Sequence, residues 1–329
     1  MNVPDYHLIS QIREQLKSAK KLLIISHQRP DGDAIGSLLA MGLALISAGK
    51  DVQMVLKDGI PDNFHFLEGS ELVITKPVGN FDYVIVVDSA EIERTQTELD
   101  YGTPDLNIDH HKTNTNFAKI NLVEEQVAAT AAILAKYLPD FGYPISKPIA
   151  NALIAGIITD TIGFRTTNVS PQLLRIVADL MDKGGELADI YYKTLIEQSI
   201  SAARYWGAGL SKIMMDDGLV WTTLSLQERH TAGYQASDDA DLVKILSAIK
   251  GAKVAIIFTE QAEGYVKISW RLCGSGETNI DVSDMAQKFG GGGHKAAAGA
   301  DVKGELDDVL AKVLAEAKLS MDHVKEAIA

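Results

Sequence analysis

The sequence predicts an α/β protein in which a largely parallel sheet, flanked by helices on both faces, is followed by a smaller α/β domain. Two observations predict this architecture. Up to about residue 185, apolar strand-like runs alternate with helical stretches, as is typical of parallel strands joined by helices. All nine prolines lie at or before Pro171, so the composition changes between the two parts of the chain.

The first part contains strands and helices in turn. Short apolar runs predict strands over residues 21–27, 51–56, 81–90 and 105–111. Longer stretches predict helices over residues 33–49 and 124–138. The apolar run 151–160 fits either a buried strand or a helix, because a run of this length is ambiguous.

The second part follows a helical connector, expected over residues 186–210. We expect strands over 218–226 and 253–273, then a glycine-rich segment, 289–300, and a helical tail. A chain of 329 residues is long enough for two domains. The predicted boundaries are 1–187 for the first domain, 188–212 for a helical linker and 213–329 for the second domain.

Composition and charge narrow the class of protein. The single cysteine, Cys273, excludes an internal disulfide and fits a reducing compartment. The sequence shows no secretory signal and no apolar run long enough to span a bilayer, so we expect a cytoplasmic protein with no membrane partner. The net charge of −13 favours a small anionic substrate or a short oligonucleotide over a long duplex, which usually requires a basic face.

Four clusters of acidic residues and histidines stand out in the first part. They are His27 with Asp31 and Asp33, then Asp88, then Asp109 with His110 and His111, and finally Asp160. Mixed carboxylate and imidazole ligands suit Mn²⁺, Mg²⁺ or Co²⁺, and the near absence of thiols argues against structural zinc. With this many ligands we expect two metal ions, an arrangement used to hydrolyse phosphate esters.

Each cluster taken singly also has an ordinary structural explanation. Asp31 and Asp33 could cap a helix that begins near Ala34, and Asp88 and Asp160 could be turn or capping residues. The triplet 109–111 is harder to explain in this way. All four clusters lie at the ends of successive predicted elements, where open α/β sheets bind ligands, so together they predict a functional site.

The glycine-rich segment predicts a phosphate site in the second domain. Four consecutive glycines expose backbone N–H groups that can surround a phosphate, although a flexible loop is the alternative. The residues we expect to bind substrate there are Gly291, Gly292, Gly293, His294 and Lys295. Arginines can clamp phosphate through two parallel hydrogen bonds. The candidates are Arg271 in the second domain, which could equally be a surface residue, and Arg94 and Arg165 just beyond the metal motifs.

With these motifs in this order, the sequence resembles the DHH superfamily of phosphoesterases, named for the triplet present here as Asp109-His110-His111. The segment 290–299, GGGGHKAAAG, resembles the substrate-binding signature of the DHHA1 domain, so the resemblance covers nearly the whole chain. The chain looks most like the bacterial subgroup of oligoribonucleases (nanoRNases) that also dephosphorylate phosphoadenosine phosphate, pAp.

The resemblance implies a role for each of the eight residues. One metal would be held by His27 and Asp31, the other by Asp33, His110 and Asp160, with Asp88 bridging the two. Asp109 would orient a histidine from outside the ligand set, as is common around metal sites. His111 would contact the scissile phosphate or assist the leaving group.

The resemblance also implies a reaction and its partners. A hydroxide activated by two metals, Mn²⁺ before Mg²⁺ or Co²⁺, would hydrolyse oligoribonucleotides of about two to five nucleotides to mononucleotides and remove the 3′-phosphate of pAp. The active site would lie in a cleft between the two domains. The implied partners are short single-stranded oligonucleotides and small nucleotides such as pAp and pApA, while a homodimer is left open.

Three alternatives remain at this point. The chain could be a stand-alone cyclic di-AMP or pApA phosphodiesterase, because the metal motifs do not identify the substrate. A family II inorganic pyrophosphatase shares the metal motifs, but the GGGGHKAAAG segment argues against it. A non-catalytic nucleotide-binding module is the third alternative, and the complete set of metal ligands argues against it.

Overall fold

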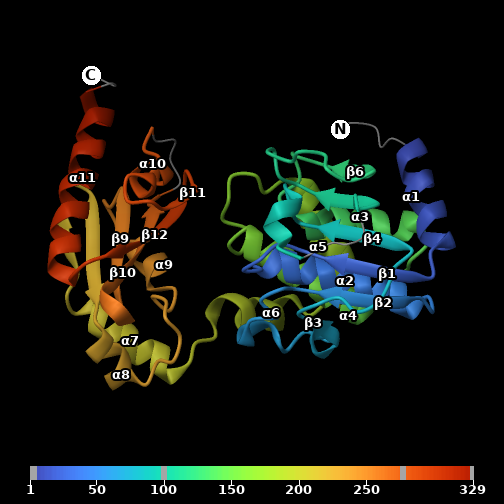
Figure 1. The fold of residues 1–329 in the computed structure, drawn as a ribbon, viewed down its shortest axis with the longest axis horizontal. Helices are drawn as coiled ribbons and strands as arrows, with labels where there is room; N and C mark the ends of the chain where they lie inside the picture. The colour runs from blue at the N-terminus through green and yellow to red at the C-terminus, as the bar shows by residue number, and fades with distance from the viewer. Residues whose placement is uncertain (1–5, 98–101, 275–278, 327–329) are drawn as a thin grey trace. The chain divides into compact units, whose positions relative to one another are not determined.

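The computed structural model describes residues 6–97, 102–274 and 279–326. The chain divides into two compact units, Met1–Glu197 and Gln198–Ala329, and each unit contains one six-stranded sheet (Figure 1). The segment predicted as a linker contains most of α6 (Leu187–Tyr191), a π-helical turn (Tyr192–Ile196) and α7 (Ile200–Leu210). None of the described helices is long and apolar enough to cross a membrane.

The first sheet is parallel throughout, in the order β3-β2-β1-β4-β5-β6. Its strands are β1 (Lys21–Ile25), β2 (Asp51–Val55), β3 (Val73–Ile74), β4 (Tyr83–Val87), β5 (Leu106–Asp109) and β6 (Ile120–Val123). From β1 the chain first adds strands on one side and then, with β4, on the other. Open sheets of this kind bind ligands at the carboxyl ends of the strands beside such a reversal. The fold therefore directs attention to the segments that follow β1 and β4.

The helices of the first unit pack mainly on one face of this sheet. They are α1 (Tyr6–Ser18), α2 (Gly32–Ser47), α3 (Thr130–Phe141), α4 (Lys147–Asp160), α5 (Pro171–Asp182) and α6, and all contribute to one large core. The ambiguous run 151–160 is thus helical. A smaller core on the other face is covered by Phe81, Ile92 and Phe117 from connecting segments. Among the described residues, this face is covered by connecting segments that include the short 3-10 helix Ile92–Thr95.

Two glycines allow α2, α3 and α4 to approach one another closely. A Cβ atom at Gly36 of α2 would clash with the carbonyl oxygen of Ala152 in α4. A Cβ atom at Gly156 of α4 would lie 2.7 Å from Cβ of Ala131 and 2.8 Å from Oδ1 of Asp33. Because neither glycine carries a side chain, the start of α2, the start of α3 and the end of α4 can meet at one place.

The second sheet is mixed, in the order β11-β12-β10-β9-β8-β7, with only the β8–β9 pair parallel. Its strands are β7 (Met214–Asp216), β8 (Leu219–Leu224), β9 (Val254–Gln261), β10 (Tyr265–Leu272), β11 (Gly292–His294) and β12 (Ala297–Lys303). Its helices are α7, α8 (Leu226–Ala232), α9 (Leu242–Leu246), α10 (Val282–Gln287) and α11 (Leu306–Glu326). Side chains alternate along β10, so Trp270 enters one core while Arg271 lies on the opposite face.

Candidate metal centre

The eight predicted residues come from the ends of five elements in the first unit. His27 follows β1, Asp88 directly follows β4, and Asp109 ends β5 with His110 and His111 after it. Asp31 and Asp33 lie at the start of α2, and Asp160 is the last residue of α4. The carboxyl ends of neighbouring parallel strands meet at one edge of the sheet, and the close packing of α2 and α4 adds the remaining carboxylates. The fold thus brings four separate sequence clusters together.

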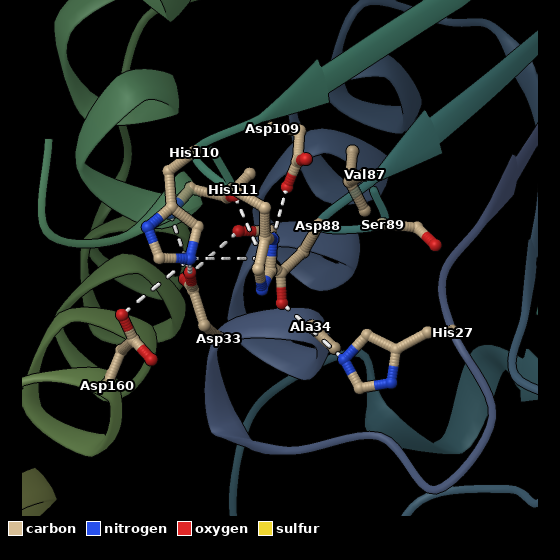
Figure 2. A network of polar contacts seen from close by, with 12 residues as sticks. His27, Asp33, Ala34, Val87, Asp88, Ser89, Asp109, His110, His111 and Asp160 are labelled. Carbon is tan, nitrogen blue, oxygen red and sulfur yellow. Dashed lines mark hydrogen bonds and ion pairs between the residues drawn. The ribbon is translucent and has the colours of Figure 1, made fainter. Parts of the chain in front are cut away.

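Asp88 lies between two histidines. Its Oδ2 atom is 3.6 Å from Nε2 of His27, and its Oδ1 atom is 3.7 Å from Nε2 of His110. Figure 2 shows His27 on one side of Asp88, and His110 with Asp160 on the other. The backbone of Asp88 has a φ of 54°, in the left-handed region that aspartate tolerates better than most residues. A buried carboxylate whose two oxygens face different imidazoles can serve two cations at once.

Further carboxylates complete a group around each histidine. Oδ1 of Asp31 lies 3.9 Å from Nε2 of His27. Nε2 of His110 lies 3.9 Å from Oδ2 of Asp33 and 3.7 Å from Oδ2 of Asp160. These separations exceed a hydrogen bond, so the facing atoms converge without satisfying one another. The sets in which all ligand atoms lie within 4.8 Å of one another are His27, Asp31 and Asp88; Asp33, His110 and Asp160; and Asp88, His110 and His111.

The carboxylates at this site are buried close together, an arrangement that bound cations would stabilise. Burial raises the pKa of Asp33 well above its ordinary value, and the charges of Asp88 and Asp160 add to this effect. Burial likewise raises the pKa of Asp160 to about 6. Burial would also raise the pKa of Asp88, but the surrounding histidines lower it to about 2. Several carboxylates in a desolvated space repel one another unless positive charge is added, so oxygen and nitrogen donors here fit hard-to-borderline divalent ions.

His111 is held by Asp109 on the side away from its Nε2 atom. Nδ1 of His111 donates a hydrogen bond of 2.7 Å to Oδ1 of Asp109, and Asn114 donates to Oδ2 of the same carboxylate at 2.6 Å. Burial alone would lower the pKa of His111, but the bond to Asp109 and the charge of Asp88 raise it to about 9. In the metal-free protein these contacts favour the protonated imidazole, which can donate a hydrogen bond or a proton.

The structure separates the roles of Asp31 and Asp33. Asp31 is the N-cap of α2, since its Oδ1 atom accepts the N–H groups of Asp33 and Ala34 at 3.1 Å. The capping explanation thus holds for Asp31, while its other contact is with His27. Asp33 is not a cap of α2, because its carboxylate instead accepts backbone N–H groups from the start of α3.

Two residues that sequence reasoning missed hold this site in place. Thr130, the first residue of α3, donates its hydroxyl to Oδ1 of Asp88 at 2.9 Å. Asn114 connects Asp109 to the buried Asn107, whose Oδ1 atom accepts from Asn114 at 2.8 Å. Neither residue follows a strand end or forms a charge pattern. The only sequence signal was that Thr130 lies in a predicted helix.

Arg94 and Arg165 lie on segments next to the site. The carbonyl oxygen of Arg94 accepts the backbone N–H of Gln28 at 2.7 Å, so its segment lies against the loop that carries His27. Arg165 follows α4, where its backbone N–H donates to the carbonyl oxygen of Thr161 at 2.8 Å. Binding of phosphate by these two arginines stays a prediction.

The glycine-rich segment forms a hairpin at the edge of the second sheet, where a loop was the alternative. A Cβ atom at Gly291 would clash with the carbonyl oxygen of Gly299, and one at Gly293 with that of Ala297. These two glycines therefore permit close contact with β12. A Cβ atom at Gly292, in contrast, would meet no heavy atom of the described residues within 4 Å.

The basic residues near the hairpin are placed differently from one another. Arg271 lies opposite Ala297 of β12, and within the described part of the chain its buried Nε atom has no hydrogen-bond partner. An unpaired buried guanidinium nitrogen is unusual and leaves a donor for a ligand. Lys295 is exposed between β11 and β12. The side chain of His294 lies outside what the structure describes.

Comparison with known proteins supports the same two-part organisation. The family model described as "DHH family, N-terminal domain" matches residues 21–157, and the model described as "DHHA1 domain" matches residues 226–319. A Thermus thermophilus protein named "Bifunctional oligoribonuclease and PAP phosphatase NrnA" is 34% identical over 326 residues, covering 95% of each chain. A Bacillus subtilis protein of the same name is 24% identical, covering 88% of this chain and 92% of that protein.

A solved structure extends the likeness to three dimensions. The crystal structure of an exopolyphosphatase-related protein from Bacteroides fragilis is similar to this chain with a TM-score of 0.89 at 25% identity. The match covers 99% of both chains. With matches that extend over both units and nearly the full length of the Thermus relative, the chain belongs to the DHH family of phosphoesterases and carries a DHHA1 domain after its DHH domain.

Proposed function

We propose that the protein is a metal-dependent phosphoesterase that hydrolyses very short oligoribonucleotides to mononucleotides and removes the 3′-phosphate of pAp. The observation that carries the proposal is the Asp88 carboxylate, whose two oxygens face His27 and His110 within a group of further carboxylates. The names of the similar Thermus and Bacillus proteins support the choice of these two substrates.

Six residues would hold two divalent ions. The proposed sets are His27 and Asp31 for one ion, and Asp33, His110 and Asp160 for the other, with Asp88 shared. Ions bound there would act as Lewis acids toward the phosphate and lower the pKa of water. Mn²⁺ is the proposed ion, because two imidazoles among carboxylates suit it better than Mg²⁺, which prefers oxygen ligands, while Co²⁺ remains an alternative.

His111 would assist departure of the leaving group. Its Nδ1 proton is bonded to Asp109, so Nε2 is the atom that can give a proton to the departing oxygen. In the metal-free protein, burial would lower the pKa of His111, but the hydrogen bond to Asp109 outweighs this and favours a proton on the imidazole. Asp109 would fix the orientation of the imidazole and stabilise its positive charge.

The second domain would bind the part of the substrate away from the bond that breaks. The division proposed is 1–187 for the catalytic domain, 188–212 for the linker and 213–329 for the substrate-binding domain. Arg271 supports this role, because its buried Nε atom has no hydrogen-bond partner among the described residues. Gly292, Lys295 and His294 would provide the neighbouring contacts, whereas Gly291 and Gly293 would act by allowing the hairpin to pack.

The remaining properties follow from composition. The net charge of −13 supports small nucleotides over long duplexes as substrates. A single cysteine, which is free and buried, supports a reducing location such as the cytoplasm. Cyclic di-AMP or pApA stays the first alternative substrate, ahead of pyrophosphate or simple nucleotide binding.

A substrate panel tests the proposal. Purified protein would be assayed with Mn²⁺, and separately with Mg²⁺, on pAp, dinucleotides, pApA, cyclic di-AMP, pyrophosphate and tripolyphosphate. Tripolyphosphate is included because the similar Bacteroides protein is described as exopolyphosphatase-related. We expect pAp and dinucleotides to be hydrolysed with the highest kcat/KM, and the Asp88→Asn variant to be inactive. A preference for pyrophosphate or tripolyphosphate would contradict the proposal. Failure to hydrolyse pAp and dinucleotides would contradict it as well.

A further inference from the structure

The start of α3 contacts two of the carboxylates at the candidate metal centre. Thr130 is fully buried, and its hydroxyl donates to Oδ1 of Asp88 at 2.9 Å. Its backbone N–H donates to Oδ2 of Asp33 at 2.6 Å, and the N–H of Ala131 donates to Oδ1 of Asp33 at 2.9 Å. One residue thus binds both Asp33 and Asp88, which lie 55 positions apart in the sequence.

The two kinds of contact have different consequences. The N–H groups at the start of a helix have no partner within the helix, so they can hold Asp33 whatever side chain is present at position 130. The bond to Asp88 depends on the hydroxyl alone. The side chain of Thr130 therefore affects Asp88 separately from Asp33.

The oxygen that Thr130 contacts is the one that faces His110. Oδ1 of Asp88 lies 3.7 Å from Nε2 of His110, while Oδ2 faces His27. The carboxylate of Asp88 can rotate about its Cβ–Cγ bond. In the observed orientation one oxygen faces His27 and the other faces His110. A hydrogen bond to Oδ1 from a fixed, buried hydroxyl favours that orientation.

We propose that Thr130 is a positioning residue, which orients the Asp88 carboxylate so that its two oxygens serve two separate cations. The inference rests on the proposed function in one respect, namely that these carboxylates bind divalent ions. The hydroxyl of Thr130 would affect cation affinity directly, and turnover only as a consequence of that affinity. Hydrogen-bond partners that orient metal ligands typically change metal affinity by 10- to 100-fold when removed.

The chain offers a matched set of variants. Thr130→Val keeps the shape of the side chain and removes the hydroxyl, while Thr130→Ser keeps the hydroxyl. Thr222→Val in the second unit is the control, because Thr222 is also buried and donates its hydroxyl, at 2.6 Å to the carbonyl oxygen of Gly209. Both valine variants lose one buried hydrogen bond, and Thr130→Val should be destabilised at least as much as Thr222→Val, because the partner of Thr130 is a carboxylate.

The experiment is a titration of metal-free protein with Mn²⁺ in a calorimeter, with thermal melting recorded alongside. We expect two ions bound by wild type, about tenfold or greater loss of affinity at one site in Thr130→Val, affinity within about twofold of wild type in Thr130→Ser, and unchanged affinity in Thr222→Val. Should Thr130→Val not fold, Thr130→Ala takes its place in the comparison.

The outcomes separate this inference from the proposed function. Two ions bound with wild-type affinity by Thr130→Val would overturn the inference alone, and so would equal losses in Thr130→Ser and Thr130→Val. If wild-type protein bound no Mn²⁺, the proposed function would fail and the inference with it.

Discussion

The Nδ1 atom of His111 lies 2.7 Å from Oδ1 of Asp109, two residues earlier in the chain. Asp109 ends a buried strand and is itself fully buried, whereas the imidazole of His111 is partly exposed. The carboxylate is fixed further by Asn114, which donates to its other oxygen. This arrangement leaves Nε2 as the atom of His111 that can act on a substrate.

The first prediction concerns leaving groups. We expect His111→Ala to lower kcat for pAp about 10²- to 10⁴-fold, because an alkoxide leaving group needs a proton. The loss should be much smaller with a p-nitrophenyl phosphodiester, whose leaving group departs without protonation. His65→Ala, at a histidine with a 55% exposed side chain, is the control and should match wild type on both substrates. Equal losses of His111→Ala on the two substrates would show that His111 does not act on the leaving group.

The second prediction concerns pH. Burial raises the pKa of Asp160 to about 6 from an ordinary 3.8. Between these two pH values, the folded metal-free protein holds a proton on Asp160 that the unfolded chain has lost. The contribution of Asp160 to stability is thus fully present below about pH 4 and is lost as the pH rises through about 6. Cations must displace the protons held by Asp160, Asp33 and His27, whose pKa values are all raised in the metal-free protein, so Mn²⁺ affinity should fall steeply below about pH 6. Calorimetry at pH 5, 6 and 7 measures this fall, and affinity independent of pH would refute the assignment of these residues as ligands.

The third prediction separates two neighbouring glycines. Gly291→Ala should lower the melting temperature, because its Cβ atom would clash with the carbonyl oxygen of Gly299. Gly292→Ala should leave the melting temperature nearly unchanged, since that Cβ atom would meet nothing within 4 Å. If Gly292 borders the bound phosphate, the added methyl group should raise KM for pAp with little change in kcat. Equal melting temperatures for the two variants would contradict the described packing of the hairpin.

The fourth prediction concerns the single cysteine. Burial raises the pKa of the Cys273 thiol to about 11, and only the thiolate reacts rapidly with alkylating agents. We expect iodoacetamide to leave the native protein unmodified at pH 8 over the time in which it alkylates the protein in guanidinium chloride. Mass spectrometry measures the modification. Rapid alkylation of the native protein would mean that Cys273 is accessible.

The convergence of the candidate ligands could be predicted from the sequence because of one geometric rule. The carboxyl ends of adjacent parallel strands lie at the same edge of the sheet, so polar residues after β1, β4 and β5 are neighbours whatever lies between them. The position of Asp160 does not follow from this rule, because the apolar run before it fits either a strand or a helix. Its place at the end of α4 depends on the close packing of Gly36 against Ala152.

Other features depend on contacts that no local pattern reveals. The hydrogen bond from Thr130 to Asp88 joins residues 42 positions apart, and a threonine at the start of a helix is common in any protein. The glycine-rich segment forms a hairpin because β11 pairs with β12, and Gly291 and Gly293 permit the close contact that this pairing requires. The face of the sheet that each helix covers could not be predicted, because alternation of strands and helices does not determine it.

The proposed metal centre requires Asp88 to bind two cations at one site. Crystals grown with Mn²⁺ and measured at the manganese absorption edge would locate the ions by their anomalous scattering. We expect two peaks, one beside His27 and Asp31 and the other beside Asp33, His110 and Asp160, with an oxygen of Asp88 bound to each. A single peak, or two peaks that do not share Asp88, would contradict it.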